Sequence, residues 1–282
     1  MGECKGGSGP VTTDMALSEE MQRFLIWYTL VTVLVTSSAV YAHHTALPEG
    51  MTEPQATWLW GYHTVPASIT RDGSPYWYGY VHTDAEKINN PAWTEVAAEH
   101  IELGAKAPAV LVLHGCAGVI RSPTAYRIFF MQRGYAVFEP DSFARPGRKP
   151  CEDDRWAETI VRRIEELRYS YKSIRTLPWV DQNRVVLMGI SEGATAVAAW
   201  RQSGFAAHII IADDCGGGQP QAPAGTPVLA VVGEKDEYFG GSSCNVTRKI
   251  KGSKSIIIPD APHNISDLPE TGKAVEEFLS WL

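Results

Sequence analysis

One pentapeptide of the chain combines residue types and spacing that can present a nucleophile. The sequence Gly-Ile-Ser-Glu-Gly spans 189–193, directly after an apolar run and directly before an Ala-rich segment. A G-x-S-x-G sequence at a strand-to-helix junction makes a turn so tight that only glycine fits two residues on either side of the serine. Such a turn lifts the serine oxygen out of the sheet. Ser191 is therefore predicted to be a catalytic nucleophile.

A serine hydroxyl is a weak nucleophile near neutral pH, so it needs a base and an acid that orients the base. In proteins with this turn, the order along the chain is serine, acid, histidine. Asp236 comes soon after the apolar run 228–232, and His263 comes soon after the run 255–258. Both loops would lie at the edge of the sheet that carries Ser191. We predict a triad of Ser191, His263 and Asp236.

Other residues compete for these roles. The alternative acids lie beside Asp236, at the end of the preceding strand-like run, or before the histidine: Glu234, Glu237, Asp213, Asp214 and Asp260. The other histidines lie before the catalytic half of the chain or beside predicted strands, where a structural role is expected: His43, His44, His63, His82, His100, His114 and His208. Cys116 is an alternative nucleophile, but no tight turn presents it.

A second motif is suited to stabilising negative charge on a carbonyl oxygen. His114-Gly115-Cys116 directly follows the apolar run 109–113. A His-Gly loop at this place supplies one backbone N–H of an oxyanion hole, and the residue after the nucleophile supplies the other. The predicted donors are the main-chain N–H groups of Cys116 and Glu192.

The elements that must position these residues alternate along the chain. Short Val-, Ile- and Leu-rich runs predict strands buried on both faces: 109–113, 136–140, 184–189, 208–212, 228–232 and 255–258. Periodic segments predict helices: 153–177, the stretch after Ser191, and 269–282. Two aromatic-rich segments, 57–65 and 76–83, flank the turn residues 72–75 and predict a hairpin. This pattern predicts a mostly parallel central sheet flanked by helices.

These residues resemble the dienelactone hydrolase family of the α/β-hydrolase superfamily, over roughly Pro108 to Leu282. Beside the serine turn, Gly233-Glu234-Lys235-Asp236 and the stretch from Gly134 to Phe143 look like that family's acid loop and fourth-strand region. The resemblance implies an α/β-hydrolase fold with little or no cap domain, acting on small esters or lactones without a metal or other cofactor. Many members carry cysteine at the turn. Ser191 instead favours a serine esterase mechanism.

The usual strand order of the α/β-hydrolase fold also indicates which of four cysteines could form disulfides. It would make the strands before Cys116 and Cys151 neighbours, and likewise those before Cys215 and Cys244. Two disulfides, Cys116–Cys151 and Cys215–Cys244, are then possible. The alternative is that some of these residues are free, buried thiols.

The remaining sequence limits the class of protein and its location. The net charge of -7 comes without a block of like charges, so we expect no nucleic-acid partner. The uncharged apolar run 24–41 ends in Val-Tyr-Ala, which is typical of a cleaved signal peptide; a membrane anchor is the alternative. We therefore predict an extension with signal peptide or anchor at 1–42, a linker at 43–55, a catalytic domain at 56–282, and export to the periplasm or medium.

The sequence alone does not decide between several interpretations of function. The expected partner is a small-molecule ester or lactone, but an acyltransferase or peptidase would use the same triad, and a binding protein could keep the fold without activity. The loop 141–154 contains Arg145, Arg148 and Lys149, which could bind a substrate carboxylate or simply face solvent. The sequence does not indicate an oligomeric state.

Overall fold

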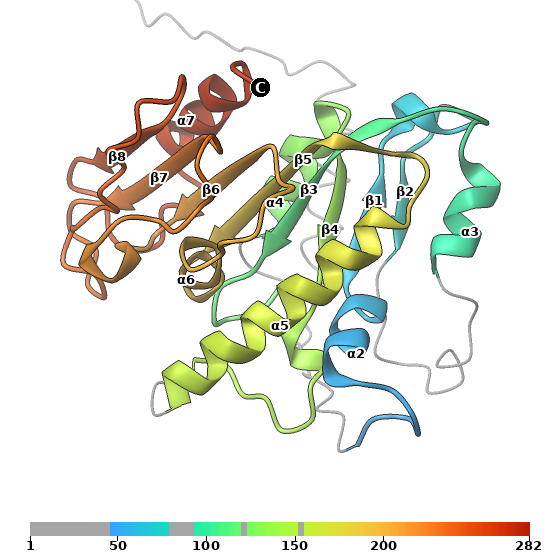
Figure 1. Ribbon diagram of the computed structural model, residues 1–282, viewed down its shortest axis with the longest axis horizontal. Coiled ribbons are helices and arrows are strands. Elements are labelled where there is room, and N and C mark those ends of the chain that lie inside the picture. The colour runs from blue at the N-terminus through green and yellow to red at the C-terminus, as the bar shows by residue number, and fades with distance from the viewer. Residues whose placement is uncertain (1–45, 79–92, 120–122, 152–154) are drawn as a thin grey trace, which may run out of the picture. The chain divides into compact units, whose positions relative to one another are not determined.

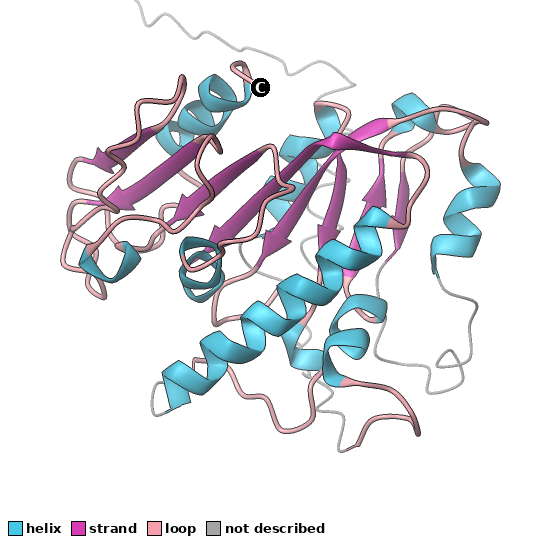
Figure 2. Ribbon diagram, viewed as in Figure 1, coloured by secondary structure: helices cyan, strands magenta, loops and turns pink. Residues whose placement is uncertain are grey.

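A twisted sheet of eight strands forms the middle layer of the structure, with helices on both faces (Figures 1 and 2). This computed structural model describes residues 46–78, 93–119, 123–151 and 155–282. The strand order is β2-β1-β4-β3-β5-β6-β7-β8. β1 pairs antiparallel with β2 and β4, and the other neighbours are parallel. The strand bounds are β1 Tyr62–Val65, β2 Tyr76–Tyr78, β3 Ala107–Leu113, β4 Ala136–Glu139, β5 Val180–Ile190, β6 Ala207–Ile211, β7 Val228–Gly233 and β8 Lys254–Ile258.

The central strands are apolar on both faces because each face carries its own hydrophobic core. Val110 of β3 lies opposite Val137 of β4 and Val186 of β5, and all three belong to one core. Helices α4 (Pro123–Gln132) and α7 (Pro269–Leu279) cover this face. The other face packs against α2 (Glu53–Leu59), α5 (Trp156–Arg175) and α6 (Glu192–Ala198), which Figure 1 shows in front of the sheet. The predicted α/β fold is confirmed.

One predicted buried strand is an edge strand instead. β8 pairs only with β7, and its side chains alternate between partly exposed and exposed until Ile258 is buried. Ile257 is 49 % exposed. The expectation that 255–258 is buried on both faces was wrong, because a run of isoleucines does not reveal whether a second neighbour strand follows.

The predicted hairpin is present in a shorter form. β1 and β2 pair antiparallel, with His63 opposite Tyr78, but residues 57–59 of the predicted first strand belong to α2. Thr52 caps this helix by accepting a hydrogen bond from the Gln55 N–H group at 3.4 Å, and Pro54 occupies its first turn. α2 thus begins inside the segment predicted as a linker, and its Trp58 is buried in the core.

Three predicted helices are confirmed: 153–177 corresponds to α5, the stretch after Ser191 to α6, and 269–282 to α7. Helices α3 (Trp93–His100) and α4 were not predicted. Each connection from β3 to β8 within the described residues holds at most one α-helix, so no cap domain is inserted there. None of the described helices is both long and apolar enough to cross a membrane. Four predicted features lie outside the described residues: the apolar segment 24–41, the linker start 43–45, the strand end 79–83 and the helix start 153–154.

Candidate active site

The turn that carries Ser191 connects β5 to α6 and has the strained backbone expected of it. Ser191 has φ 50° and ψ -117°, in the left-handed half of conformational space. A Cβ atom on Gly189 would lie 2.6 Å from the Ala194 nitrogen, and one on Gly193 would lie 2.6 Å from the Leu113 carbonyl carbon. Both positions therefore require glycine, which is why the two glycines flank the serine at this spacing.

The structure brings the predicted triad side chains together. Ser191 follows β5, Asp236 follows β7, and His263 follows β8, and these strands share one parallel arrangement. His263 Nε2 lies 2.9 Å from Ser191 Oγ, and His263 Nδ1 lies 2.8 Å from Asp236 Oδ2. This is the hydrogen-bonded chain of hydroxyl, imidazole and carboxylate that a nucleophilic serine requires.

Asp236 is held so that one oxygen faces the histidine. Its Oδ1 atom accepts hydrogen bonds from the backbone N–H groups of Tyr238 and Phe239, both at 2.9 Å, and the residue is 2 % exposed. Oδ2 remains directed at His263. The turn after β7 therefore fixes the orientation of the carboxylate toward His263.

Two of the alternative acids hold the histidine loop. Glu237 accepts a hydrogen bond from the backbone N–H of His263 at 3.0 Å, and Glu234 accepts one from the backbone N–H of Asp260 at 2.9 Å. The hydrogen bond from His263 lowers the pKa of Glu237 because it favours the carboxylate. This role of Glu237 and Glu234 was not predicted from the sequence. Its only signal was the density of acidic residues in 234–237.

Asp213, the alternative acid at the end of β6, points elsewhere. It accepts hydrogen bonds from the Thr195 hydroxyl and, at 2.7 Å, from the Cys215 backbone N–H. Burial raises the pKa of Asp213 to about 6. Asp213 also lies with Cys215 and Cys244 in the only potential metal-binding group found among the described residues. Those two cysteines form a disulfide with a Cα–Cα distance of 4.9 Å, so they offer no thiolate to a metal.

The His-Gly loop after β3 runs beside the serine. A Cβ atom on Gly115 would lie 3.5 Å from Ser191 Cβ. His114 is fully buried; its Nδ1 lies 2.7 Å from the Gly115 carbonyl oxygen, and its Nε2 accepts the Ser142 backbone N–H at 3.1 Å. Burial and the adjacent Arg163 cation hold the pKa of His114 well below its usual value. His114 is therefore a neutral structural residue, as expected.

The two predicted disulfides are present, and the first braces this loop. Cys116 and Cys151 are bonded with a Cα–Cα distance of 4.7 Å. The Cys151 backbone N–H also donates to the Cys116 carbonyl oxygen at 3.2 Å. The bond ties the loop beside Ser191 to the loop that precedes α5.

A buried ion-pair network lies directly behind the serine. The Glu192 side chain is 1 % exposed, 2.6 Å from Arg148 Nη2 and 3.7 Å from Arg163 Nε. Glu166 continues the network, 2.9 Å from Arg163 and 3.6 Å from Arg145. The alternative that the arginines of loop 141–154 face solvent was wrong for Arg145 and Arg148, because both are buried in these pairs. Of the three cationic residues Arg145, Arg148 and Lys149, only Lys149 is exposed.

Aromatic side chains surround the histidine. The Tyr238 ring packs edge-on against the His263 ring at a centroid distance of 4.7 Å, and the Phe239 ring lies 5.7 Å away. Tyr238 is 71 % exposed. An exposed aromatic surface therefore lies next to the histidine.

A mostly parallel eight-stranded sheet with a serine on a strained strand-to-helix turn defines a hydrolase of the α/β-hydrolase type. Residues 96–257 match the dienelactone hydrolase family, and the chain belongs to that family. No curated protein matches the chain by sequence.

Several solved structures are similar to this chain at low identity. Esterase PE8 is 17 % identical, with 63 % of this chain and 94 % of that chain covered and a TM-score of 0.47. A putative dienelactone hydrolase from Klebsiella pneumoniae is 16 % identical, with 64 % and 88 % covered and a TM-score of 0.43. Est1E from Butyrivibrio proteoclasticus is 14 % identical, with 64 % and 88 % covered and a TM-score of 0.44.

Proposed function

We propose that the protein is a serine esterase that cleaves a carboxylic ester or lactone through an acyl-enzyme. The observation that carries the proposal is the hydrogen-bonded chain from Ser191 through His263 to Asp236, with heavy-atom distances of 2.9 and 2.8 Å. Both distances lie within the range in which an imidazole accepts a hydroxyl proton and a carboxylate orients it.

In the proposed reaction, His263 Nε2 takes the Ser191 proton as Oγ attacks the substrate carbonyl. The tetrahedral oxyanion accepts hydrogen bonds from the backbone N–H groups of Cys116 and Glu192. Two observations support these donors. Glu192 is the first residue of α6, where an N–H group has no acceptor within the helix, and the Gly115 turn passes beside Ser191.

The intermediate then collapses and the alcohol leaves with the proton held by His263. Water, deprotonated by the same imidazole, attacks the acyl-enzyme and releases the acid. In a lactone the leaving alcohol stays attached to the acyl group, so one product is a hydroxy acid. Tyr238 supports a substrate with an apolar or aromatic group next to the reacting carbonyl, because its exposed ring lies against His263.

The test is covalent labelling with a fluorophosphonate probe, followed by a panel of aryl esters of graded acyl length and of lactones. We expect the wild type to be labelled, and Ser191→Ala to be unlabelled with ester hydrolysis reduced by about 10⁴-fold or more. Ser242→Ala removes an exposed serine from the loop after Asp236 and is the matched control. Labelling of Ser191→Ala at the wild-type rate, or near-normal hydrolysis by it, would end the proposal.

The two disulfides support export, because such bonds persist in oxidising compartments. We propose that the segment before the catalytic domain directs this export. Mass spectrometry of the protein made in its native host should find an N-terminus just after Ala42. An intact segment 24–41 in the membrane fraction would favour the anchor instead, and reduced protein in the cytoplasm would refute export.

A further inference from the structure

One short stretch of the chain contacts both residues that are proposed to donate to the oxyanion. Within 148–151, Arg148 pairs with the Glu192 side chain at 2.6 Å, and Cys151 is bonded to Cys116 through the first disulfide. The Cys151 backbone N–H also donates to the Cys116 carbonyl oxygen at 3.2 Å. Each proposed oxyanion donor is a main-chain N–H group, so its position depends on how the backbone around it is held. The stretch 148–151 is therefore placed to set the geometry of the oxyanion hole.

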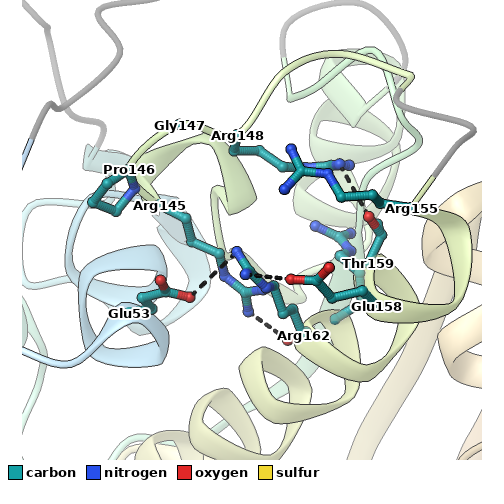
Figure 3. A pocket seen from close by; sticks show the side chains of 10 residues that line it. Glu53, Arg145, Pro146, Gly147, Arg148, Arg155, Glu158, Thr159 and Arg162 are labelled. Carbon is teal, nitrogen blue, oxygen red and sulfur yellow. Dashed lines mark hydrogen bonds and ion pairs between the residues drawn. The ribbon is translucent and has the colours of Figure 1, made fainter.

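The beginning of this loop is anchored on α5. Arg148 donates a hydrogen bond to the Thr159 hydroxyl at 3.4 Å, and Arg145 donates one to the Arg162 carbonyl oxygen (Figure 3). Arg145 and Arg148 are 2 % and 6 % exposed. Reduction of a disulfide breaks none of these contacts. The start of the loop and its contact with Glu192 should therefore stay in place whatever the redox state of the cysteines.

The end of the loop depends on the disulfide. Cys151 has φ 49°, in the left-handed region that residues with a side chain rarely adopt. Such a conformation persists where the surrounding contacts hold it. Two contacts to Cys116 do so here, the disulfide and the backbone hydrogen bond. Reduction leaves only the hydrogen bond of these two, so Cys151 should relax and release the segment that contains Cys116.

The first disulfide is more accessible to a reductant than the second. Cys151 is exposed and Cys116 is partly exposed. In the second disulfide, Cys244 is 1 % exposed and Cys215 is partly exposed. The rate of thiol–disulfide exchange depends on the access of the attacking thiolate to a sulfur atom. A thiol reductant should therefore open Cys116–Cys151 before Cys215–Cys244.

We propose that the Cys116–Cys151 disulfide is a redox switch of the active site: fast hydrolysis requires the bond, and its reduction weakens the stabilisation of the oxyanion. This inference rests on the proposed serine esterase function and on the two proposed donors. The protein is then a slow enzyme in a reducing cytoplasm and a fast one after it reaches an oxidising compartment.

The switching step is a thiol–disulfide exchange with a dithiol reductant. A reductant thiolate attacks one sulfur and forms a mixed disulfide, and the other cysteine leaves as a thiolate. The second reductant thiolate then attacks the reductant sulfur of the mixed disulfide and releases the remaining cysteine. Two electrons and two protons pass from the dithiol to Cys116 and Cys151, and the reductant becomes a disulfide.

The test compares the oxidised full-length protein with protein that has been treated with dithiothreitol and then freed of it. Alkylation and peptide mass mapping of a parallel sample identify the reduced cysteines. Fluorophosphonate labelling to completion counts the competent sites, so kcat in aryl ester hydrolysis is expressed per competent site and unfolded molecules do not contribute.

Reduction of Cys116 and Cys151 should lower kcat by about tenfold or more and change KM by less than about twofold, because the backbone donors act mainly in the transition state. Reoxidation with glutathione disulfide should restore kcat. Cys116→Ala/Cys151→Ala should have the low kcat before treatment and should not respond to dithiothreitol. Cys215→Ala/Cys244→Ala is the matched control, which keeps the first disulfide and should respond to reduction as the wild type does.

Three results would overturn the switch. The first is an unchanged kcat per competent site in protein whose Cys116 and Cys151 are mapped as reduced, including a loss of competent sites alone, which would make the bond purely structural. The second is an equal loss of kcat on reduction of Cys116→Ala/Cys151→Ala. The third is an oxidised wild type that is neither labelled nor active on esters and lactones, and only this result refutes the proposed function as well.

Discussion

Replacing Arg148 by methionine tests whether the buried ion pair behind the serine matters for stability and for the reaction. The substitution leaves Glu192 1 % exposed without its partner at 2.6 Å. Removing one member of a buried ion pair costs about 3–5 kcal/mol, because the other charge stays buried. Arg163 remains 3.7 Å from Glu192, so we expect the lower part of that range, about 3 kcal/mol.

That loss has a measurable consequence for the thermal midpoint and for turnover. In a domain of this size, each 1 kcal/mol lowers Tm by about 2–4 °C, so Arg148→Met should melt about 6–12 °C below the wild type. Glu192 is also the proposed second oxyanion donor. A displaced backbone at that residue should lower kcat by roughly tenfold to a hundredfold, with a smaller change in KM, because the N–H acts mainly in the transition state.

The assay combines urea unfolding, thermal melting and aryl ester kinetics on two further variants. Arg133→Met breaks an ion pair of the same 2.6 Å length, between side chains 31 % and 60 % exposed, and should cost about 1 kcal/mol or less. The double variant Arg148→Met/Glu192→Gln should regain part of the lost stability, because glutamine leaves no unpaired charge. If Arg148→Met is as stable and as active as Arg133→Met, the reasoning about burial is refuted.

Three more outcomes follow from the same structure. Gly193→Ala places a methyl group 2.6 Å from the Leu113 carbonyl carbon. Fluorophosphonate labelling of the folded fraction should therefore fall by about tenfold or more. Labelling at the wild-type rate would contradict this steric argument. Cys116→Ala/Cys151→Ala removes the disulfide between two residues with a sequence separation of 35. The free energy of unfolding, measured by urea titration, should fall by about 4 kcal/mol. An unchanged urea midpoint would contradict the presence of this disulfide. The folded-state pKa of Asp213 is raised to about 6, so the stability it contributes is present at low pH and lost as pH rises through 6. The stability of Asp213→Asn relative to wild type should therefore increase by roughly 1–2 kcal/mol from pH 5 to pH 7.5, and a pH-independent difference would refute the shift.

The sequence alone was enough to predict the parts of the site that depend on local backbone geometry and chain order. The turn around Ser191 is specified by its two glycines, since any side chain there would overlap a backbone atom within the next turn or the neighbouring strand. The alternation of apolar runs with periodic segments also predicted a mostly parallel sheet flanked by helices. Chain order then placed Asp236 and His263 at the same sheet edge, where the structure has them in contact.

Contacts between side chains that are far apart in the sequence could not be predicted without the tertiary structure. Asp213, Glu237 and Asp236 all follow strands, and only the path of each loop decides that Asp236 faces the histidine while Glu237 holds the histidine backbone. Arg148 and Glu192 are charged residues in a loop and a turn, which sequence patterns assign to solvent. They are buried because α5 places Arg163 and Glu166 behind them.

The same distinction explains the secondary structure that was misassigned. Residues 57–59, Thr-Trp-Leu, have a length and composition that suit either a strand or a turn of a helix. Thr52 and Pro54 favour the start of a helix, and α5 supplies the surface on which that helix packs. β8 has the composition of a buried strand but no further strand beside it. Local geometry is encoded in adjacent residues and can be read from them. Burial and pairing depend on residues far apart in the chain, so only the folded structure decides them.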